Sequence, residues 1–157
     1  MAQPAPPSDF DRDCHEVMSS CACESLRRTS RAVTARYQEG LRAVGVSAAQ
    51  LPILVAAHVM GPAPVGSLAT QLLMDRTTLT RNLVGLRDAG LVTVDPDVDR
   101  RVRLVALTPA GRRTLRRGIR AWRDAQAQMV SLFGSERMSA LVGELGALAG
   151  LAAPEQL

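Results

Sequence analysis

The chain has 157 residues, 46% of them hydrophobic, which is enough for one domain or for a small domain with added dimerisation elements. All 19 basic residues are arginine, and a net charge of +4 favours an anionic partner. The apolar stretches are much shorter than the roughly 20 residues that span a bilayer, and no signal-peptide pattern is present. We therefore expect a cytoplasmic protein without a membrane segment.

The N-terminal part is expected to be a flexible arm followed by a helix. Residues 1–12 are rich in proline and polar side chains, which is typical of a loose arm. From about residue 13 to 43, apolar side chains recur at the helical spacing, and Gly45 ends this pattern. The whole chain has only four aromatic residues, so we expect an aliphatic, mostly helical core.

Two further helices are expected between residues 47 and 73. Ser47 and Gln50 fit a capping box, in which each side chain bonds the backbone N–H of the other residue. The helix that follows, about 48–60, is apolar on nearly all sides, as is typical of a buried helix. The sequence GPAP at 61–64 predicts a turn, and a short helix is expected over 65–73.

The next helix, about 76–89, combines an apolar face with an unusual outward face. Asp75 is a suitable N-cap for it. Leu79, Leu83 and Leu86 follow one another at i, i+4 and i+7 and must face the core. The residues left outward are Arg76, Thr77, Thr80, Arg81 and Arg87, with Thr78 near the boundary.

Threonine and arginine on this face suit nucleic acid better than solvent. A merely solvated helix favours Glu and Lys, which have better helix propensity and form i, i+4 pairs. The threonine hydroxyl and methyl groups suit phosphates and thymine methyl groups, and arginine can bind guanine or phosphate through two hydrogen bonds. The pattern predicts a helix that reads the DNA major groove; the alternative is a surface helix of odd composition.

A β-hairpin is expected directly after this helix. Gly90 suits the left-handed residue that follows a helix end, and strands are expected at 91–94 and 102–107, joined by a polar turn at 96–101. An arginine on such a thin ribbon can enter the narrow, electronegative minor groove, whereas the alternative is a charged, solvated turn. The arginines concerned are Arg100, Arg101 and Arg103, and Asp99 is placed to orient one of them.

Two helices are expected to close the chain. Thr108 caps a long helix with Pro109 at its first position, which runs to about Leu132, and Ser135 caps a last helix to about residue 151. Arg112 and Arg113 would meet phosphates beside the groove. For the later arginines of this helix we expect a solvated face with local pairing; acids of a partner subunit are the alternative. These later arginines are Arg116, Arg117, Arg120 and Arg123.

The expected fold is mainly α with a small β-hairpin wing: a winged helix-turn-helix with long terminal dimerisation helices. We divide it into a flexible N-terminal arm (1–12), an N-terminal dimerisation helix region (13–46), a winged helix-turn-helix DNA-binding domain (47–111) and C-terminal dimerisation helices (112–157).

The sequence resembles the MarR family of bacterial transcriptional regulators. The matching stretches are LATQLLMDRTTLTRNLVGLRDAGLV and DRRVRLVALTPAGR, which carry the family's D-R-x-T-x-T-R helix, D-R-R wing and closing L-T-x-x-G in order. The resemblance extends more loosely over about residues 20–150. It implies a homodimer that binds a pseudo-palindromic operator and usually represses transcription.

The resemblance also implies roles for individual residues. By the match of motifs, Thr77, Thr80 and Arg81 would read the major groove. Arg101 would enter the minor groove, and Asp99 with Arg100 would brace the wing. The DNA-binding set from helix and wing together is Arg76, Thr77, Thr78, Thr80, Arg81, Arg100, Arg101 and Arg103.

Three cysteines, Cys14, Cys21 and Cys23, lie within ten residues. Their odd number argues against a disulfide scaffold, and the lack of a C-x-x-C pair argues against a closed zinc site, so we predict no metal and no cofactor. They are either small hydrophobic residues at a helix contact or oxidant-sensing thiols, as in some proteins similar to MarR, or, least favoured, ligands of a shared metal.

Members of this family also bind small aromatic acids between the dimer helices and the DNA-binding lobe. In this sequence Tyr37, His58 and Trp122 could line such a pocket for an aromatic or phenolic effector, although residues of these types are more often simply packed. Arg36 or Arg42 could meet the carboxylate of the effector.

Three classes of function differ in how well they fit this sequence. A homodimeric DNA-binding regulator accounts for the Thr and Arg face and for the arginine-rich wing. A winged-helix protein–protein interaction module without DNA binding is the alternative, but it would need neither. An enzyme is not expected, because the sequence has no Ser/His/Asp set, no H-E-x-x-H and no phosphate-binding glycine loop.

Overall fold

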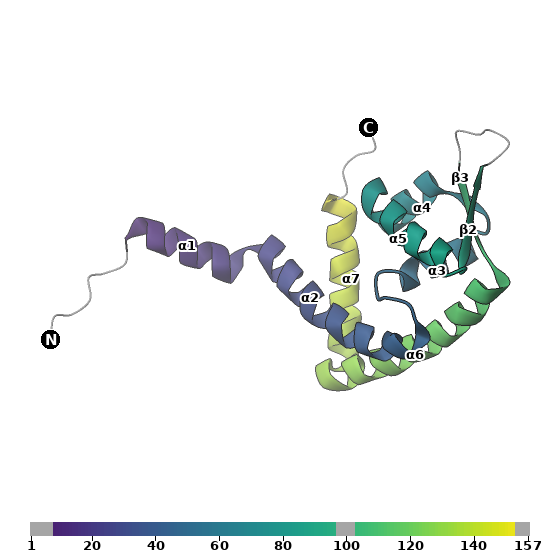
Figure 1. The fold of residues 1–157 in the computed structure, drawn as a ribbon. Coiled ribbons are helices and arrows are strands. Elements are labelled where there is room, and N and C mark those ends of the chain that lie inside the picture. Colours follow the sequence, from purple (N-terminus) through teal and green to yellow (C-terminus); the bar gives the residue numbers. More distant parts are fainter. Residues whose placement is uncertain (1–7, 97–102, 153–157) are drawn as a thin grey trace. The chain divides into compact units, whose positions relative to one another are not determined.

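The structure, a computed structural model, describes residues 8–96 and 103–152, and most of these are helical (Figure 1). The chain divides into two units, residues 1–36 and 37–157, and each is described by itself. The expected wing residues at positions 99–101 lie outside the described residues.

The first unit contains α1 (Asp9–Ser20) and most of α2 (Ala22–Leu41). A single helix from about residue 13 was expected, and that prediction was wrong in its start. The helix begins at Asp9 because Ser8 and Asp11 form a capping box: the Asp11 N–H donates to Ser8 Oγ at 3.2 Å, and the Ser8 N–H donates to Asp11 Oδ2 at 2.9 Å. Residues 9–12 are therefore helical and not part of a loose arm.

The expected helix is also interrupted at Cys21, whose backbone is extended (φ −67°, ψ 111°). The two residues before it donate side-chain hydrogen bonds back to the helix, from Ser19 Oγ to the His15 carbonyl at 2.8 Å and from Ser20 Oγ to the Glu16 carbonyl at 2.7 Å. Serine hydroxyls that bond carbonyls one turn back weaken and bend helices. This pair accounts for the break, which apolar periodicity does not reveal.

The second unit opens with the end of α2, a single turn η1 (Arg42–Val44) and Gly45 in the left-handed region at φ 82°. The predicted capping box is confirmed, because the Ser47 N–H donates to Gln50 Oε1 at 3.0 Å and the Gln50 N–H donates to Ser47 Oγ at 3.1 Å. The buried helix α3 (Leu51–Val59) follows it, three residues later than expected.

The helices α4 (Val65–Leu72) and α5 (Arg76–Asp88) form the helix-turn-helix. Leu73 ends α4 in the left-handed conformation at φ 48°, which is unusual for a residue with a side chain. Asp75 then caps α5, as predicted: its Oδ1 accepts the Thr78 N–H at 2.8 Å. The two helices pack against each other and against α3 or the sheet.

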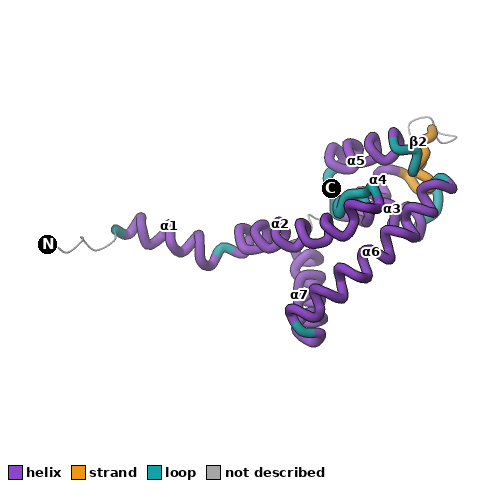
Figure 2. Tube along the Cα trace, turned by 60° about the horizontal axis from the view of Figure 1, so that its bottom comes forward, coloured by secondary structure: helices purple, strands orange, loops and turns teal. Residues whose placement is uncertain are grey.

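A three-stranded antiparallel sheet, in the order β1-β3-β2, packs against these helices. Figure 2 shows its strands in orange, next to one end of α5. The strands β2 (Val92–Pro96) and β3 (Arg103–Leu107) are the predicted hairpin, with Val94 opposite Val105. The strand β1 (Ala63–Pro64) was predicted as the second half of a turn at 61–64, and that prediction was wrong for these two residues, whereas Pro62 lies in a bend and Gly61 has a φ of 71°. Proline is tolerated there because β1 is an edge strand and pairs on one side only.

The start of α6 (Pro109–Phe133) lies against Gly90 and Leu91, which come shortly after the end of α5. Thr108 caps α6, since its Oγ1 accepts the Gly111 N–H at 2.9 Å, and the same hydroxyl donates to the Gly90 carbonyl at 2.8 Å. A Cβ on Gly111 would lie only 1.9 Å from the Leu91 carbonyl oxygen. Glycine is required there because the two backbones approach so closely.

The last helix, α7 (Ser135–Ala152), follows Gly134 and packs against α6. The core of the second unit is aliphatic, as expected, and contains no buried polar or charged residue among those described. No described helix is long and apolar enough to span a bilayer. The most deeply buried side chains are Leu41, Ile53, Leu54, Leu68, Leu79, Leu86 and Val105.

Candidate nucleic-acid interface

The orientation of α5 follows from three buried leucines. Leu79, Leu83 and Leu86 are 0%, 4% and 1% exposed, as the spacing predicted. Each buried leucine contributes about 1.5–3 kcal/mol relative to an exposed one, so rotation of the helix about its axis would lose several kcal/mol. The other side of α5 is thereby held toward solvent.

The outward side of α5 carries the predicted side chains. Those of Arg76, Thr77, Thr80 and Arg81 are exposed, and Thr78 is half-buried. Among the described residues, no carboxylate forms an ion pair with Arg76 or Arg81. The exposed arginines therefore keep their hydrogen-bond donors available for an anionic ligand.

The N-terminal end of α5 carries one acid, Asp75, beside the exposed arginines. Hydrogen bonds from the Thr78 side chain and backbone hold the pKa of the Asp75 carboxyl below its usual 3.8. Asp75 therefore stays ionised at neutral pH and fixes the first turn, although its charge opposes the approach of a phosphate. The neighbouring arginines outnumber it.

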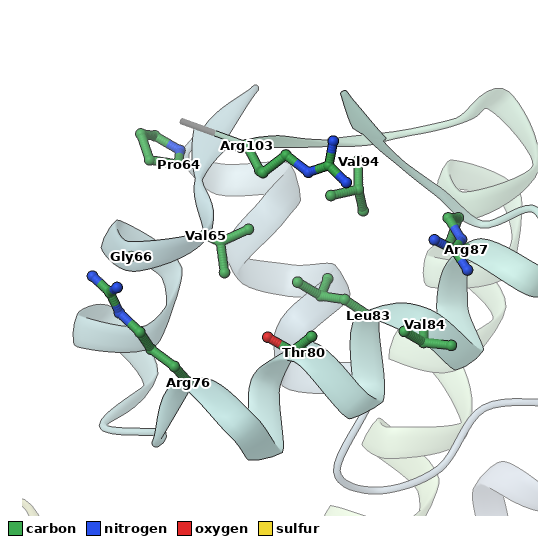
Figure 3. Close-up of a pocket in the computed structure, with 10 residues that line it drawn as sticks. All are labelled: Pro64, Val65, Gly66, Arg76, Thr80, Leu83, Val84, Arg87, Val94 and Arg103. Atoms are coloured by element: carbon green, nitrogen blue, oxygen red, sulfur yellow. The ribbon is translucent and has the colours of Figure 1, made fainter. Parts of the chain in front are cut away.

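A hollow of 480 Å³ separates α5 from the start of α4 and from the sheet, and we call it the recognition hollow (Figure 3). Four polar side chains border it: Arg76 and Thr80 on α5, Arg87 near the end of α5, and Arg103 at the start of β3. The apolar floor is formed by Leu83, Val84, Val65 and Val94 together with Pro64 and Gly66.

The hollow brings Arg103, an expected wing residue, to the same surface as the α5 residues. Arg103 is exposed, and in Figure 3 its side chain lies along the sheet toward Val94. Arg87 was predicted to point outward but was not assigned to the site; it lies on the rim of the hollow, where its guanidinium also forms an ion pair with Asp88 at 2.9 Å. The signal for Arg87 was its position on the outward face, eleven residues after Arg76.

Three expected wing residues, Asp99, Arg100 and Arg101, lie outside the described residues. Their roles in bracing the wing and entering the minor groove therefore stay predictions. The strands β2 and β3 that flank this segment are described and paired, with Pro96 opposite Arg103.

The predicted sensor residues lie in or next to the helices of the first unit. Cys14 on α1 and Cys23 on α2 are exposed, Cys21 at the break is half-buried, and all three are free thiols. Among the described residues, no group of three or more His, Cys, Asp and Glu side chains is arranged to hold a metal ion. The thiols of Cys14 and Cys23 are therefore accessible to solvent in the single chain.

The three predicted effector-pocket residues do not line one common cavity. Trp122 borders an apolar hollow of 570 Å³, His58 borders a second hollow of 380 Å³, and both hollows lie between α3 and α6. Tyr37 donates a hydrogen bond to Gln126 Oε1 instead, and burial raises the pKa of its hydroxyl. Sequence spacing did not reveal this separation, because the three residues come from different helices.

Comparison with known proteins agrees with the winged helix-turn-helix geometry. Residues 46–102 match the sequence model of the MarR family. No curated protein matches the chain.

Solved structures are similar over most of the chain. The transcriptional regulator MosR of M. tuberculosis, solved in complex with DNA, is 32% identical, with 84% of this chain and 98% of that one covered and a TM-score of 0.73. A probable transcriptional regulator of Pseudomonas aeruginosa is 28% identical (83% and 98% covered, TM-score 0.75). The repressor CouR, bound to a 23-mer DNA duplex, is 24% identical (85% and 95% covered, TM-score 0.77), and CouR is also solved with p-coumaroyl-CoA.

The likeness to MosR covers nearly the whole of that regulator, and the family match covers the helix-turn-helix and the start of the wing. The predicted winged helix-turn-helix fold is confirmed. The prediction that the protein is not an enzyme is confirmed as well, since the related proteins are DNA-binding regulators. This chain belongs to the MarR family and is a DNA-binding transcriptional regulator.

Proposed function

We propose that the protein is a homodimeric cytoplasmic repressor that binds a pseudo-palindromic operator. The observation that carries this proposal is the outward face of α5, where Thr77, Thr80 and Arg81 are exposed over a buried row of leucines. Two such helices related by a two-fold axis read half-sites roughly one helical turn, ~10 bp, apart.

The proposed dimer is supported by the apolar surface of α7. No residue from 135 to 151 is buried within the single chain, and Leu141, Val142, Leu145 and Leu148 are 37–60% exposed. Monomeric proteins rarely leave a contiguous apolar patch uncovered. We assign α7 and the end of α6, within residues 112–157, to the dimer contact, together with the helices of residues 13–46.

Selection from a pool of random 30-bp duplexes tests the proposal. We expect the recovered sequences to share two inverted half-sites, and hydroxyl-radical footprinting to show protection at both, on one side of the duplex. Recovery of no common sequence, with equal retention of all duplexes, would show that the protein does not read an operator.

The minor-groove role of Arg101 has its own test. We expect Arg101→Ala to weaken operator binding by ~1–3 kcal/mol, the scale of a good base contact, in a fluorescence-anisotropy titration with the selected duplex. Unchanged affinity would reject this role while leaving the α5 assignment intact.

Control by a small molecule or by thiol oxidation is the second part of the proposal. The apolar hollow beside Trp122 supports an aromatic or phenolic effector, and the binding of p-coumaroyl-CoA by the related fold of CouR agrees with it. The exposed Cys14 and Cys23 support an oxidant sensor. An effector needs to supply only ~1–3 kcal/mol of coupling to change operator occupancy.

A protein-binding module without DNA binding is the alternative. The salt dependence of DNA binding distinguishes the two, because a protein that neutralises several phosphates loses DNA affinity steeply between ~50 and 200 mM salt.

Peroxide treatment of the protein and of a C14S/C21S/C23S variant, followed by the operator titration, tests the thiol sensor. Equal loss of affinity in both would assign the oxidation effect to other residues.

A further inference from the structure

Two glutamine side chains connect the end of α2 with α5. The Ala48 N–H, in the turn that leads into α3, donates to Gln38 Oε1 on α2 at 2.8 Å. In the same turn, the Ser47 N–H donates to Gln50 Oε1 at 3.0 Å, which holds the Gln50 amide in place. All four residues are half-buried. We call Gln38 and Gln50 the amide link.

The second member of the amide link lies against a glycine of α5. A Cβ added to Gly85 would lie 3.3 Å from Gln50 Nε2, which is closer than an ordinary van der Waals contact. Glycine is a poor helix former, so alanine would suit the interior of α5 better on propensity alone. Arg81 lies four residues before Gly85 and is therefore its neighbour on the helix surface. The close approach of Gln50 thus explains the glycine and reaches the part of α5 that carries Arg81.

The amide link joins two helices with different proposed tasks. The helix α2 belongs to those that we assign to the dimer contact, and α5 carries the side chains that we expect to meet DNA. The chain between them passes through η1, α3 and α4, so the amide link is a shorter path from one to the other. Loss of the partner of a half-buried backbone N–H is costly. The bond from Ala48 to Gln38 therefore resists movement of this turn along α2.

We propose that Gln38 and Gln50 are positioning residues, which hold α5 in a fixed place relative to the dimer contact and so set the half-site spacing that the protein accepts. Moving two half-sites apart by one base pair displaces them by ~3.4 Å and rotates them by roughly 35°. Two firmly held α5 helices match one spacing, whereas two loosely held ones accept several. The spacing preference therefore depends on residues that need not touch DNA, an inference that rests on the proposed homodimer and operator.

Operators of different spacing test the amide link. The full chain is titrated by fluorescence anisotropy with the selected operator, with two derivatives whose half-sites lie one base pair closer or farther apart, and with a duplex that carries one half-site. We expect the natural protein to bind the selected spacing at least tenfold more tightly than either derivative. A residue with a merely structural role would not change this ratio, because the half-sites are the same in all three operators.

Two replacements of Gln38 separate its hydrogen bond from its size. Gln38→Met removes the acceptor at a similar side-chain length, whereas Gln38→Glu keeps an acceptor oxygen. We expect Gln38→Met to reduce the spacing preference to less than about threefold, with its affinity for the single half-site within about twofold of the natural value. Gln38→Glu should keep the tenfold preference.

Gln71→Met is the matched control, because Gln71 is exposed on α4 and lies outside the amide link. Circular-dichroism melts show whether each variant folds. If Gln38→Met does not fold, Gly85→Ala replaces it under the same criteria, since its methyl group displaces the Gln50 amide while alanine favours the helix.

The natural protein and the variants report on different parts of the proposal. If the natural protein prefers one spacing and Gln38→Met keeps that preference, the role of the amide link is overturned and the proposed operator stands. An equal loss of preference in Gln71→Met would also overturn that role. If the natural protein binds all three spacings equally, the proposed operator fails, and the role of the amide link fails with it.

Discussion

At the scale of single residues, Gly111 shows how closely the wing and α6 are joined. The Leu91 carbonyl oxygen lies 1.9 Å from the position of a Cβ on Gly111, so either backbone must move if a side chain is added. The Thr108 hydroxyl bonds the Gly90 carbonyl at the same point. This junction sets the position of β2 and β3 relative to the helices.

We therefore expect Gly111→Ala to lower the free energy of unfolding by about 1–3 kcal/mol, the range for overpacked sites. For a chain of this size, each kcal/mol lost lowers Tm by about 2–4 °C. Differential scanning calorimetry measures this effect. Gly66→Ala is the control, because the nearest atom to its new Cβ is Arg76 Nη2 at an ordinary 3.5 Å. A melt of Gly111→Ala that matches the control would show that the junction has room to relax.

The residues that sequence reasoning placed correctly are those governed by local chemistry. Asp75, Thr108 and the Ser47–Gln50 pair cap helices as their types and spacing predict. The leucines of α5 are buried because their spacing matches the helical period. Each of these features depends on residues a few positions apart in the chain.

At the scale of elements, the features that were missed depend on distant or competing contacts. The strand β1 exists only because β3 lies beside it, and its sequence has the composition of a turn. The break at Cys21 arises from serine hydroxyls that compete for helix carbonyls. The separate hollows of His58 and Trp122 depend on how α3 packs on α6, which spacing within one helix does not encode.

The start of α5 gives a pH-dependent prediction. The folded-state pKa of Asp75 lies below its usual 3.8 because the carboxylate accepts hydrogen bonds from Thr78. The Asp75 carboxylate therefore contributes its full stabilisation above pH 3.8, and this contribution is lost as the pH falls through the lower pKa of the folded state.

We expect Asp75→Ala to lower the free energy of unfolding at pH 7, and to lose less further free energy of unfolding than the natural protein below pH 3.8. Asp75→Asn is the control, since asparagine also caps helices but carries no titrating carboxyl. Urea unfolding at neutral and acidic pH measures both. Equal acid sensitivity of the natural protein and Asp75→Asn would show that Asp75 does not link the stability of the fold to pH.

At the scale of the whole molecule, the dimer that we propose through α7 would let the α5 helices of two protomers bind one duplex together. Leu148 is 43% exposed in the single chain, so a charged side chain there does not disturb the core of the protomer. Ser139 lies nine residues earlier, roughly two and a half turns, and thus faces the opposite side of α7.

We expect Leu148→Glu to convert the dimer to a monomer in sedimentation-velocity experiments and to weaken operator binding at least tenfold, because a charge in an apolar contact is costly. Ser139→Glu adds the same charge on the other side and should leave the dimer intact. A Leu148→Glu protein that sediments as a dimer would place the contact elsewhere.

We propose that the buried leucines of α5 direct the Arg81 guanidinium into a major groove, where it binds base edges. The most direct measurement compares the anisotropy-measured affinities of Arg81→Ala and Arg117→Ala for the selected operator and for a scrambled duplex. Arg117 carries the same charge, but its guanidinium bonds the Ala43 carbonyl at 3.0 Å. We predict that Arg81→Ala loses ~1–3 kcal/mol of affinity for the operator and little for the scrambled duplex, while Arg117→Ala keeps the discrimination. If Arg81→Ala still prefers the operator over the scrambled duplex as strongly as the natural protein does, Arg81 does not read the operator.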